Sequence, residues 1–213
     1  MTSRVKFSND LNTLIDEVID MGRKVYSRLD GVTNCLSIDD MNTARKIVYD
    51  DSFINELEYR INTRAITMIT AESPVATDLR VIIASIKTAM ELERISDNIS
   101  NIAEVRKRIK IENDNLLLRL YTMERLAVLM MNDIYTAFRE KDMELCLEIL
   151  DRDEDIDRLF VQISTSDILE ESDLFVSGQC QLCAKYLERI GDHIKNIAEH
   201  VYFINTGERF EVR

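Results

Sequence analysis

A thirteen-residue segment occurs twice in this chain, and the duplication constrains the fold more than any other feature. The segment LERISDNISNIAE at 92–104 is followed 95 residues later by LERIGDHIKNIAE at 187–199. Over the longer windows 89–104 and 184–199, eleven of sixteen positions are identical. A 213-residue chain that repeats near its half-length is expected to contain two copies of one structural unit.

The composition predicts that both copies are helical. The chain has five Gly, one Pro and no Trp, so the residues that punctuate sheets and tight turns are scarce. Leu92, Ile95, Ile99 and Ile102 recur every three or four positions, which is the spacing of one buried helix face. We expect six long helices, at roughly 7–35, 39–71, 75–110, 113–140, 143–170 and 174–206.

Three helices that wrap together bury the apolar face of each copy, so we predict an all-α fold of two tandem three-helix bundles. The first is expected to span residues 1–110 and the second residues 111–213.

Capping and turn residues mark the expected helix ends. Ser37, followed by Asp39 and Asp40, is expected to cap the second helix, and Asn113 or Asp114 the fourth. Pro74 suits the first turn of the third helix. Gly178 lies near the start of the sixth helix and is expected to loosen that helix. Gly207 is expected to end it.

Charge limits the partners of this chain. Acidic residues outnumber basic ones 39 to 27, and the net charge of −12 repels phosphate backbones and anionic lipids. We therefore expect no nucleic acid partner, and cations or basic protein faces as the natural ones. The chain shows no run of eighteen uncharged apolar residues and no secretory leader pattern. These features predict a cytoplasmic protein without direct membrane insertion.

Four cysteines, Cys35, Cys146, Cys180 and Cys183, are too few and too scattered for a disulfide framework in a chain of this length. The pair in CQLC has the spacing of a redox or half-zinc motif. A structural zinc site needs four soft ligands, and redox pairs usually follow a strand. Reduced, packed thiols are the simpler interpretation.

Acidic side chains follow the duplicated helix on a flank of its apolar face. With about 100° per residue, Glu93 and Asp97 lie together in the first copy. Glu188 and Asp192 do the same in the second copy. Like charges four residues apart repel by about 0.2–0.5 kcal/mol when exposed, so each pair is a mild liability unless something offsets it.

The preceding helix of each copy carries a matching pair. If the two helices pack with these flanks adjoining, outside the apolar interior, four oxygen-bearing side chains meet on a patch that suits a hard cation. Asn55 lowers the charge of the first patch by one, which predicts weaker cation binding there. The other interpretation is that these stripes are only solvated helix faces. The candidate metal ligands are Asp51, Asn55, Glu93, Asp97, Asp153, Asp157, Glu188 and Asp192.

At these residues the sequence resembles the PhoU phosphate-uptake regulators, whose Glu/Asp-x-x-x-Asp motif recurs through two three-helix repeats. The segments 72–104, 151–159 and 183–208 carry the resemblance, which spans essentially the whole chain. It implies a cytosolic helical adaptor, often a homodimer, that is not an enzyme. Such an adaptor negatively controls phosphate uptake and the phosphate-starvation response. The implied partners are the ATPase of the phosphate ABC transporter and a phosphate-sensing histidine kinase.

The resemblance also implies multinuclear iron or zinc clusters on the motif-bearing face. Their ligands would be Asp51, Glu93 and Asp97 in one repeat, and Asp153, Asp157, Glu188 and Asp192 in the other. Because Asn55 departs from the acidic pattern, the resemblance leaves open whether the first repeat holds a full cluster.

A carboxylate-bridged metal enzyme or metal-storage bundle is the alternative function. Di-iron oxidases place Glu-x-x-His pairs in a bundle core, whereas His193 and His200 have no Glu three residues earlier. With so few Gly and His residues, neither a phosphate cradle nor a nucleophile elbow is predicted. Elemental analysis separates the alternative from an adaptor.

Overall fold

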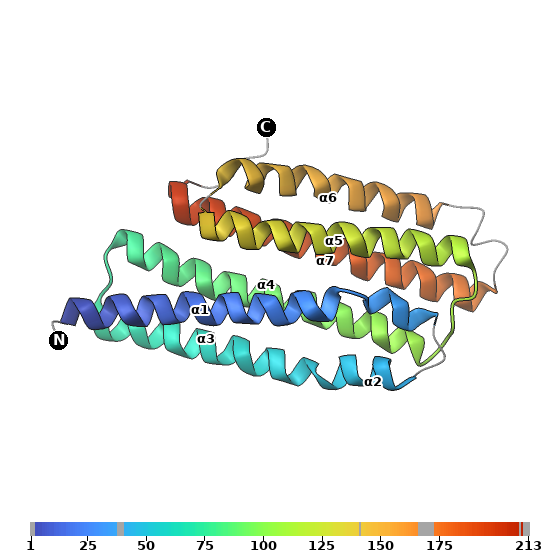
Figure 1. The fold of residues 1–213 in the computed structure, drawn as a ribbon, viewed down its shortest axis with the longest axis horizontal. Coiled ribbons are helices and arrows are strands. Elements are labelled where there is room, and N and C mark those ends of the chain that lie inside the picture. Colours follow the sequence, from blue (N-terminus) through green and yellow to red (C-terminus); the bar gives the residue numbers. More distant parts are fainter. Residues whose placement is uncertain (1–2, 38–40, 141, 166–172, 209, 211–213) are drawn as a thin grey trace.

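The computed structural model describes residues 3–37, 41–140, 142–165, 173–208 and 210. Within these ranges the chain is helical and contains no strand. The helices are α1 (Ser3–Leu29), the 3-10 helix η1 (Val32–Leu36), α2 (Met41–Tyr49), α3 (Asp51–Glu72), α4 (Ala76–Arg106), α5 (Asp114–Glu140), α6 (Met143–Ser164) and α7 (Leu174–Thr206) (Figure 1).

The helices form two bundles that lie side by side along their length (Figure 1). The first contains α1, α3 and α4, with the short α2 continuing the line of α3, and the second contains α5, α6 and α7. The most extensive helix contact joins α4 and α7, the two helices that carry the duplicated segment. The predicted all-α fold of two three-helix units is confirmed.

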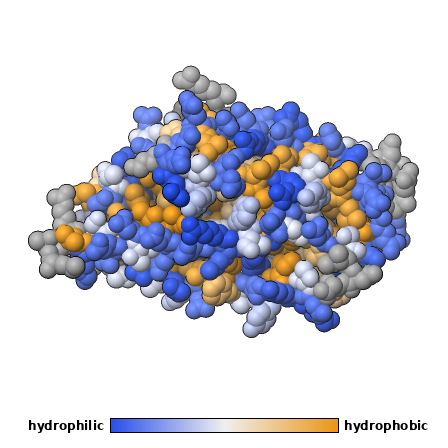
Figure 2. Space-filling model, in the orientation of Figure 1, coloured by the Kyte–Doolittle hydropathy of each residue, from blue (hydrophilic) through white to orange (hydrophobic). Residues whose placement is uncertain are grey.

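One apolar core runs through both bundles. It includes Ile95 and Ile99 of α4 and Ile190 and Ile194 of α7, all of which are fully buried. The predicted apolar stripe therefore serves both its own bundle and the contact with the other repeat. The outside is largely hydrophilic on the face shown in Figure 2, with separated apolar patches. Among the described helices, none is both long and apolar enough to cross a membrane.

The first predicted helix, 7–35, is wrong at its end. α1 stops at Leu29, and Gly31 follows with a φ of 90°, a left-handed conformation that glycine adopts without steric cost. The next residues continue as a 3-10 helix. Val32, Cys35 and Leu36 are buried there, so the apolar pattern continues although the α-helix does not.

The second predicted helix, 39–71, is divided at Asp50. The carbonyl of Ile47, which an unbroken helix would pair with the N–H of Asp51, accepts a hydrogen bond from Arg28 over 2.8 Å. The N–H of Phe53 donates to the carbonyl of Asp50, an i to i+3 bond that tightens the chain at this point. A side chain of α1 therefore separates α2 from α3.

Two predicted helix ends are confirmed. The Asn113 side chain accepts hydrogen bonds from the N–H groups of Asn115 and Leu116, at 3.0 and 3.2 Å, and so caps α5. Gly207 ends α7 with a φ of 75°, and its N–H donates to the carbonyl of Phe203.

Two other predicted helix starts differ or are not described. Pro74 lies just before Val75, the N-cap of α4, and not in the first turn of the helix. The Ser37 hydroxyl donates to the carbonyl of Asn34 at the end of η1. Asp39 and Asp40, predicted beside it, lie outside the described residues.

Candidate functional site

In the second repeat, one lysine pairs with a predicted carboxylate and feels the charges of two more. Lys195 of α7 donates a hydrogen bond to Oδ2 of Asp153 on α6 over 3.0 Å. This bond and the charges of Asp192 and Asp157 raise the pKa of Lys195 above its ordinary value. We call Asp153, Asp157, Asp192 and Lys195 the second cluster. The α6 and α7 carboxylates thus act on the same lysine, and their role as metal ligands stays a prediction.

Asp153 does not lie outside the apolar interior, and this part of the prediction is wrong. Its side chain is 0% exposed, and its Oδ1 lies against Gly191 without a hydrogen-bond partner. A Cβ atom at position 191 would lie 2.8 Å from that oxygen, so the carboxylate enters the interface because residue 191 is glycine. Burial raises the pKa of Asp153, and Lys195 opposes the shift.

Glu188 is paired separately. Its Oε1 accepts a hydrogen bond from Lys185 of the same helix over 2.6 Å. Its Oε2 is buried and has no hydrogen-bond partner. The charges that act on Lys195 come from the aspartates of the second cluster. The structure therefore gives Glu188 a partner on its own helix.

In the first repeat, Asp51 accepts several hydrogen bonds through one oxygen. Its Oδ1 accepts hydrogen bonds from the hydroxyls of Ser96 and Ser100 on α4, over 2.8 and 2.9 Å. It also accepts one from Nη2 of Arg28 on α1, over 3.2 Å. Arg28 also donates to the Ser100 hydroxyl over 2.8 Å. Burial lowers the pKa of Arg28, while the charges of Asp51, Asp50 and Asp97 oppose that shift.

Two carboxylates of α4 adjoin this group. Burial and the charge of Asp51 raise the pKa of Asp97. Burial raises the pKa of Glu93, and the negative charges of Asp97, Glu58 and Asp51 raise it further. We call Asp51, Glu93, Asp97 and Arg28 the first cluster. Asn55 is solvent-exposed.

Sequence reasoning missed Glu58 of α3 in the neighbourhood of Glu93. It lies seven residues after Asp51, and a helix returns to nearly the same face after seven residues. This spacing is the signal that could have found it.

The arrangement of these side chains does not fit an iron or zinc cluster. A basic side chain already occupies each acidic group, and the basic nitrogens compete with a metal for the same oxygens. Within the ranges that the structure describes, no three or more His, Cys, Asp or Glu side chains are placed to hold a metal ion. Iron or zinc binding by the eight predicted residues remains a prediction of the family resemblance.

The junction of the repeats contains a second polar group that the sequence did not indicate. Glu91 of α4 accepts a hydrogen bond from Nδ2 of Asn196 over 3.3 Å through its Oε2. The same oxygen lies 2.7 Å from Nδ1 of His193. Burial alone would raise the pKa of Glu91, but these hydrogen bonds outweigh it and lower the pKa. Burial lowers the pKa of nearby His200. The two repeats are therefore joined by polar contacts as well as by the core.

A fully buried carboxylate on α5 also joins the repeats. Glu124 accepts the N–H of Gly31 at 2.8 Å through Oε1. Its Oε2 accepts the N–H and the hydroxyl of Thr33, at 2.7 and 2.5 Å. The only sequence signal was a charged residue between Met123 and Ala127 on an apolar helix face. The 3-10 turn of the first repeat is thereby held by the second.

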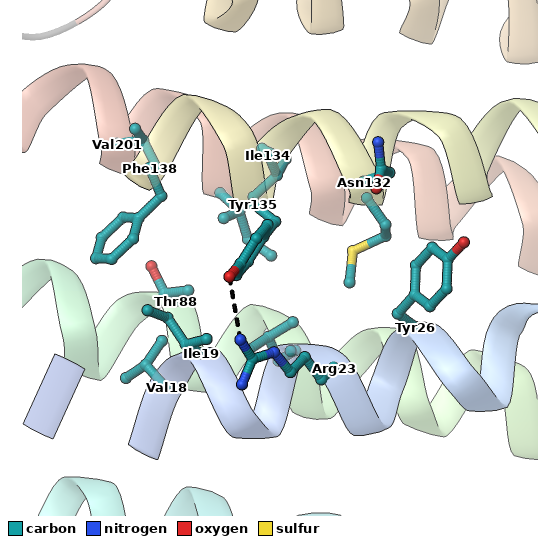
Figure 3. A pocket seen from close by; sticks show the side chains of 14 residues that line it. Val18, Ile19, Arg23, Tyr26, Thr88, Asn132, Ile134, Tyr135, Phe138 and Val201 are labelled. Atoms are coloured by element: carbon teal, nitrogen blue, oxygen red, sulfur yellow. Dashed lines mark hydrogen bonds between the residues drawn. The ribbon is translucent and has the colours of Figure 1, made fainter. Parts of the chain in front are cut away.

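An apolar groove of about 330 Å³ lies where the repeats meet. Its walls come from α1 and α5, and α4 and α7 contribute to its lining (Figure 3). Arg23 of α1 donates a hydrogen bond to the hydroxyl of Tyr135 on α5 over 3.0 Å (Figure 3). Arg139 donates to the same hydroxyl over 3.4 Å. The apolar lining includes Val18, Ile19, Ile134, Phe138 and Val201.

The fold and the acidic clusters define a tandem three-helix-bundle protein whose motif-bearing helices pack against each other. The family model for the PhoU domain matches residues 18–105 and again residues 120–201. The chain belongs to the PhoU family.

Relatives match this chain over nearly its whole length. A phosphate-specific transport system accessory protein PhoU homolog of Clostridium acetobutylicum is 29% identical, over 100% of this chain and 99% of the relative. A Borreliella burgdorferi relative with the same description is 32% identical, over 97% of both chains. The crystal structure of PhoU from Pseudomonas aeruginosa is 25% identical with a TM-score of 0.87, and covers 95% of this chain and 100% of that one.

Proposed function

We propose that this chain is an accessory regulator that restrains phosphate-specific transport and the phosphate-starvation response through protein contacts in the cytoplasm. The observation that carries this proposal is the match of both repeats to the PhoU domain, together with full-length relatives described as phosphate-specific transport system accessory proteins. Both halves of the regulator fold are therefore represented in this chain.

The proposed partners are the ATPase of the phosphate ABC transporter and a phosphate-sensing histidine kinase, and the proposed assembly is a homodimer. The net charge of −12 favours basic faces on such partners. Asp97 of the first cluster and Asp157 of the second are exposed, so they are available for contact. The clusters would then contribute to docking by charge complementarity.

Co-purification tests the proposal. Tagged chain, isolated from cells grown with ample phosphate, is expected to bring down the transporter ATPase. Deletion of the gene is expected to leave phosphate-starvation genes expressed under the same conditions. Recovery of the chain without the ATPase, together with normal repression in the deletion strain, would overturn the proposal.

Charge reversal locates the docking face. Asp157→Arg is expected to weaken ATPase capture, whereas Glu154→Arg changes the net charge equally at an exposed position of the same helix outside the cluster. Equal capture by both variants and the wild type would show that the second cluster does not take part in docking.

A further inference from the structure

We propose that Lys195 and Arg28 are the permanent counter-ions of the two acidic clusters and take the place of the iron or zinc that the family resemblance implies. The inference concerns the charge balance inside the chain and does not rest on the proposed regulatory function. It is argued from the positions of the two basic side chains and from a comparison of the two repeats.

In the second cluster the cation is part of the packing. Nζ of Lys195 lies 3.0 Å from Oδ2 of the fully buried Asp153. A carboxylate in this environment is strongly disfavoured unless a counter-ion is present, because burial removes its hydration. The same ammonium is attracted to Asp157 and Asp192. One lysine therefore offsets the mutual repulsion of three aspartates.

The repeat alignment shows which positions differ between the two repeats around this cation. The 95-residue offset pairs Ser96 with Gly191 and Ser100 with Lys195. In the first repeat both serine hydroxyls donate to Asp51. In the second repeat the glycine admits the corresponding aspartate into the interface, and the lysine donates to it. The two differences act together, since deeper burial of the carboxylate requires a full positive charge.

The first repeat obtains its cation from another helix. Because Ser96 and Ser100 are neutral donors, the positive charge beside Asp51 comes from Arg28 of α1. The Arg28 side chain is only 10% exposed and donates to Ile47, Ser100 and Asp51. Its hydrogen-bond acceptors lie on three other helices, α2, α3 and α4, so it is not a mobile surface side chain. The two repeats thus neutralise equivalent aspartates from different helices.

At the two aspartates that face the neighbouring helix, Asp51 and Asp153, oxygens that a metal would need are already engaged or enclosed. Oδ1 of Asp51 accepts three donors, which exceeds its two lone pairs. Oδ2 of Asp153 accepts a hydrogen bond from Lys195, while its Oδ1 is buried against Gly191. A divalent ion entering either cluster would have to displace a bound cation, and the displaced charge would remain nearby and repel it.

Removing the lysine is expected to create a metal site. We would compare wild type, Lys195→Met and Lys185→Met after dialysis, by elemental analysis and by calorimetric titration with Zn²⁺. Lys185→Met is the matched control, because it removes a lysine of the same helix that pairs with Glu188 and leaves Asp153, Asp157, Asp192 and Lys195 unchanged. The wild type is expected to carry no stoichiometric iron or zinc and to keep its melting temperature in EDTA. Lys195→Met is expected to bind Zn²⁺ at least about tenfold more tightly than both other proteins.

Two results would overturn the proposal. One is wild-type protein with tightly bound iron or zinc whose removal by EDTA lowers the melting temperature. The other is a folded Lys195→Met variant with no gain in Zn²⁺ affinity over Lys185→Met. If Lys195→Met does not fold, Asp153→Asn in the same chain is expected to restore folding, because the uncompensated carboxylate is removed. Failure of that double variant to fold would also overturn it.

Discussion

The backbone N–H of Thr33 donates to the buried carboxylate of Glu124 over 2.7 Å, so a side chain of the second repeat closes a turn of the first. The same carboxylate accepts the Thr33 hydroxyl and the N–H of Gly31. An amide side chain in this position would place its NH₂ group against a hydrogen-bond donor. The contact therefore depends on a carboxylate at residue 124.

We predict that Glu124→Gln lowers the free energy of unfolding by about 2–3 kcal/mol, because buried donors lose a charged acceptor. Urea unfolding followed by circular dichroism measures the change. Glu154→Gln is the control, since residue 154 is exposed on α6, and it is expected to stay within about 0.5 kcal/mol of wild type. Equal stability of the two variants would show that the contact contributes nothing.

Two glycines of α7 are predicted to respond in opposite directions to alanine. At Gly191 the new Cβ would lie 2.8 Å from Oδ1 of Asp153 and 3.1 Å from Ile156, so we expect a loss of about 1–3 kcal/mol. At Gly178 nothing lies within 4 Å, and alanine should stabilise the helix by up to about 1 kcal/mol. Thermal and urea unfolding of both variants provide the measurement. A stabilising Gly191→Ala would contradict the described position of Asp153.

Acidification is predicted to weaken the repeat junction. The pKa of His200 is lowered by burial, so the folded state resists protonation that the unfolded chain accepts. The stability that this group contributes is complete above its ordinary pKa of about 6.5 and is lost as pH falls below that value. The pKa of Glu91 is also lowered, so its contribution is lost at still lower pH.

Urea unfolding between pH 7.5 and 5.5 isolates the histidine. We expect the wild type to lose stability across this range, and His200→Gln to show a smaller slope because it removes the titrating group. Between pH 5.5 and 4 both proteins should continue to lose stability through Glu91. An unchanged slope in His200→Gln would exclude the histidine as the source.

The four thiols are predicted to be unreactive in the folded protein. Burial raises the pKa of Cys35 to about 12 and that of Cys180 to about 11, and raises the pKa of Cys183 well above its ordinary value. Cys146 is raised to about 11 for the same reason. A disulfide reagent at pH 8 should therefore modify the chain only after denaturant is added, and then at four sites. Rapid reaction of the native protein would contradict this burial and would revive a redox role for CQLC.

The helices and the approach of the acidic stripes were predictable because they follow from local spacing. Ile95 and Ile99 are buried and Asp97 is exposed, as a 3.6-residue period requires. The end of α1 was not predictable from spacing, because Val32 and Leu36 remain buried in a 3-10 helix that continues the apolar pattern. Only Gly31 marked the change.

The depth of each aspartate was not predictable from its own helix. Asp51 and Asp153 occupy matching positions in the motif, yet Asp51 is 18% exposed and Asp153 is fully buried. The difference is set by the facing residues, Ser96 in one repeat and Gly191 in the other. The burial of each aspartate therefore depends on the residue that faces it from the neighbouring helix, and the periodicity of a single helix does not reveal that residue.

The packing of α4 against α7 has a consequence for how such a chain is assembled. Each of these helices turns fully buried isoleucines into a core that both repeats share. A chain with only one repeat would expose that apolar surface to water, and pairing with a second such chain would bury it again. In the present chain the covalent link between the repeats keeps the two apolar surfaces together, while each half draws its positive charge from a different helix.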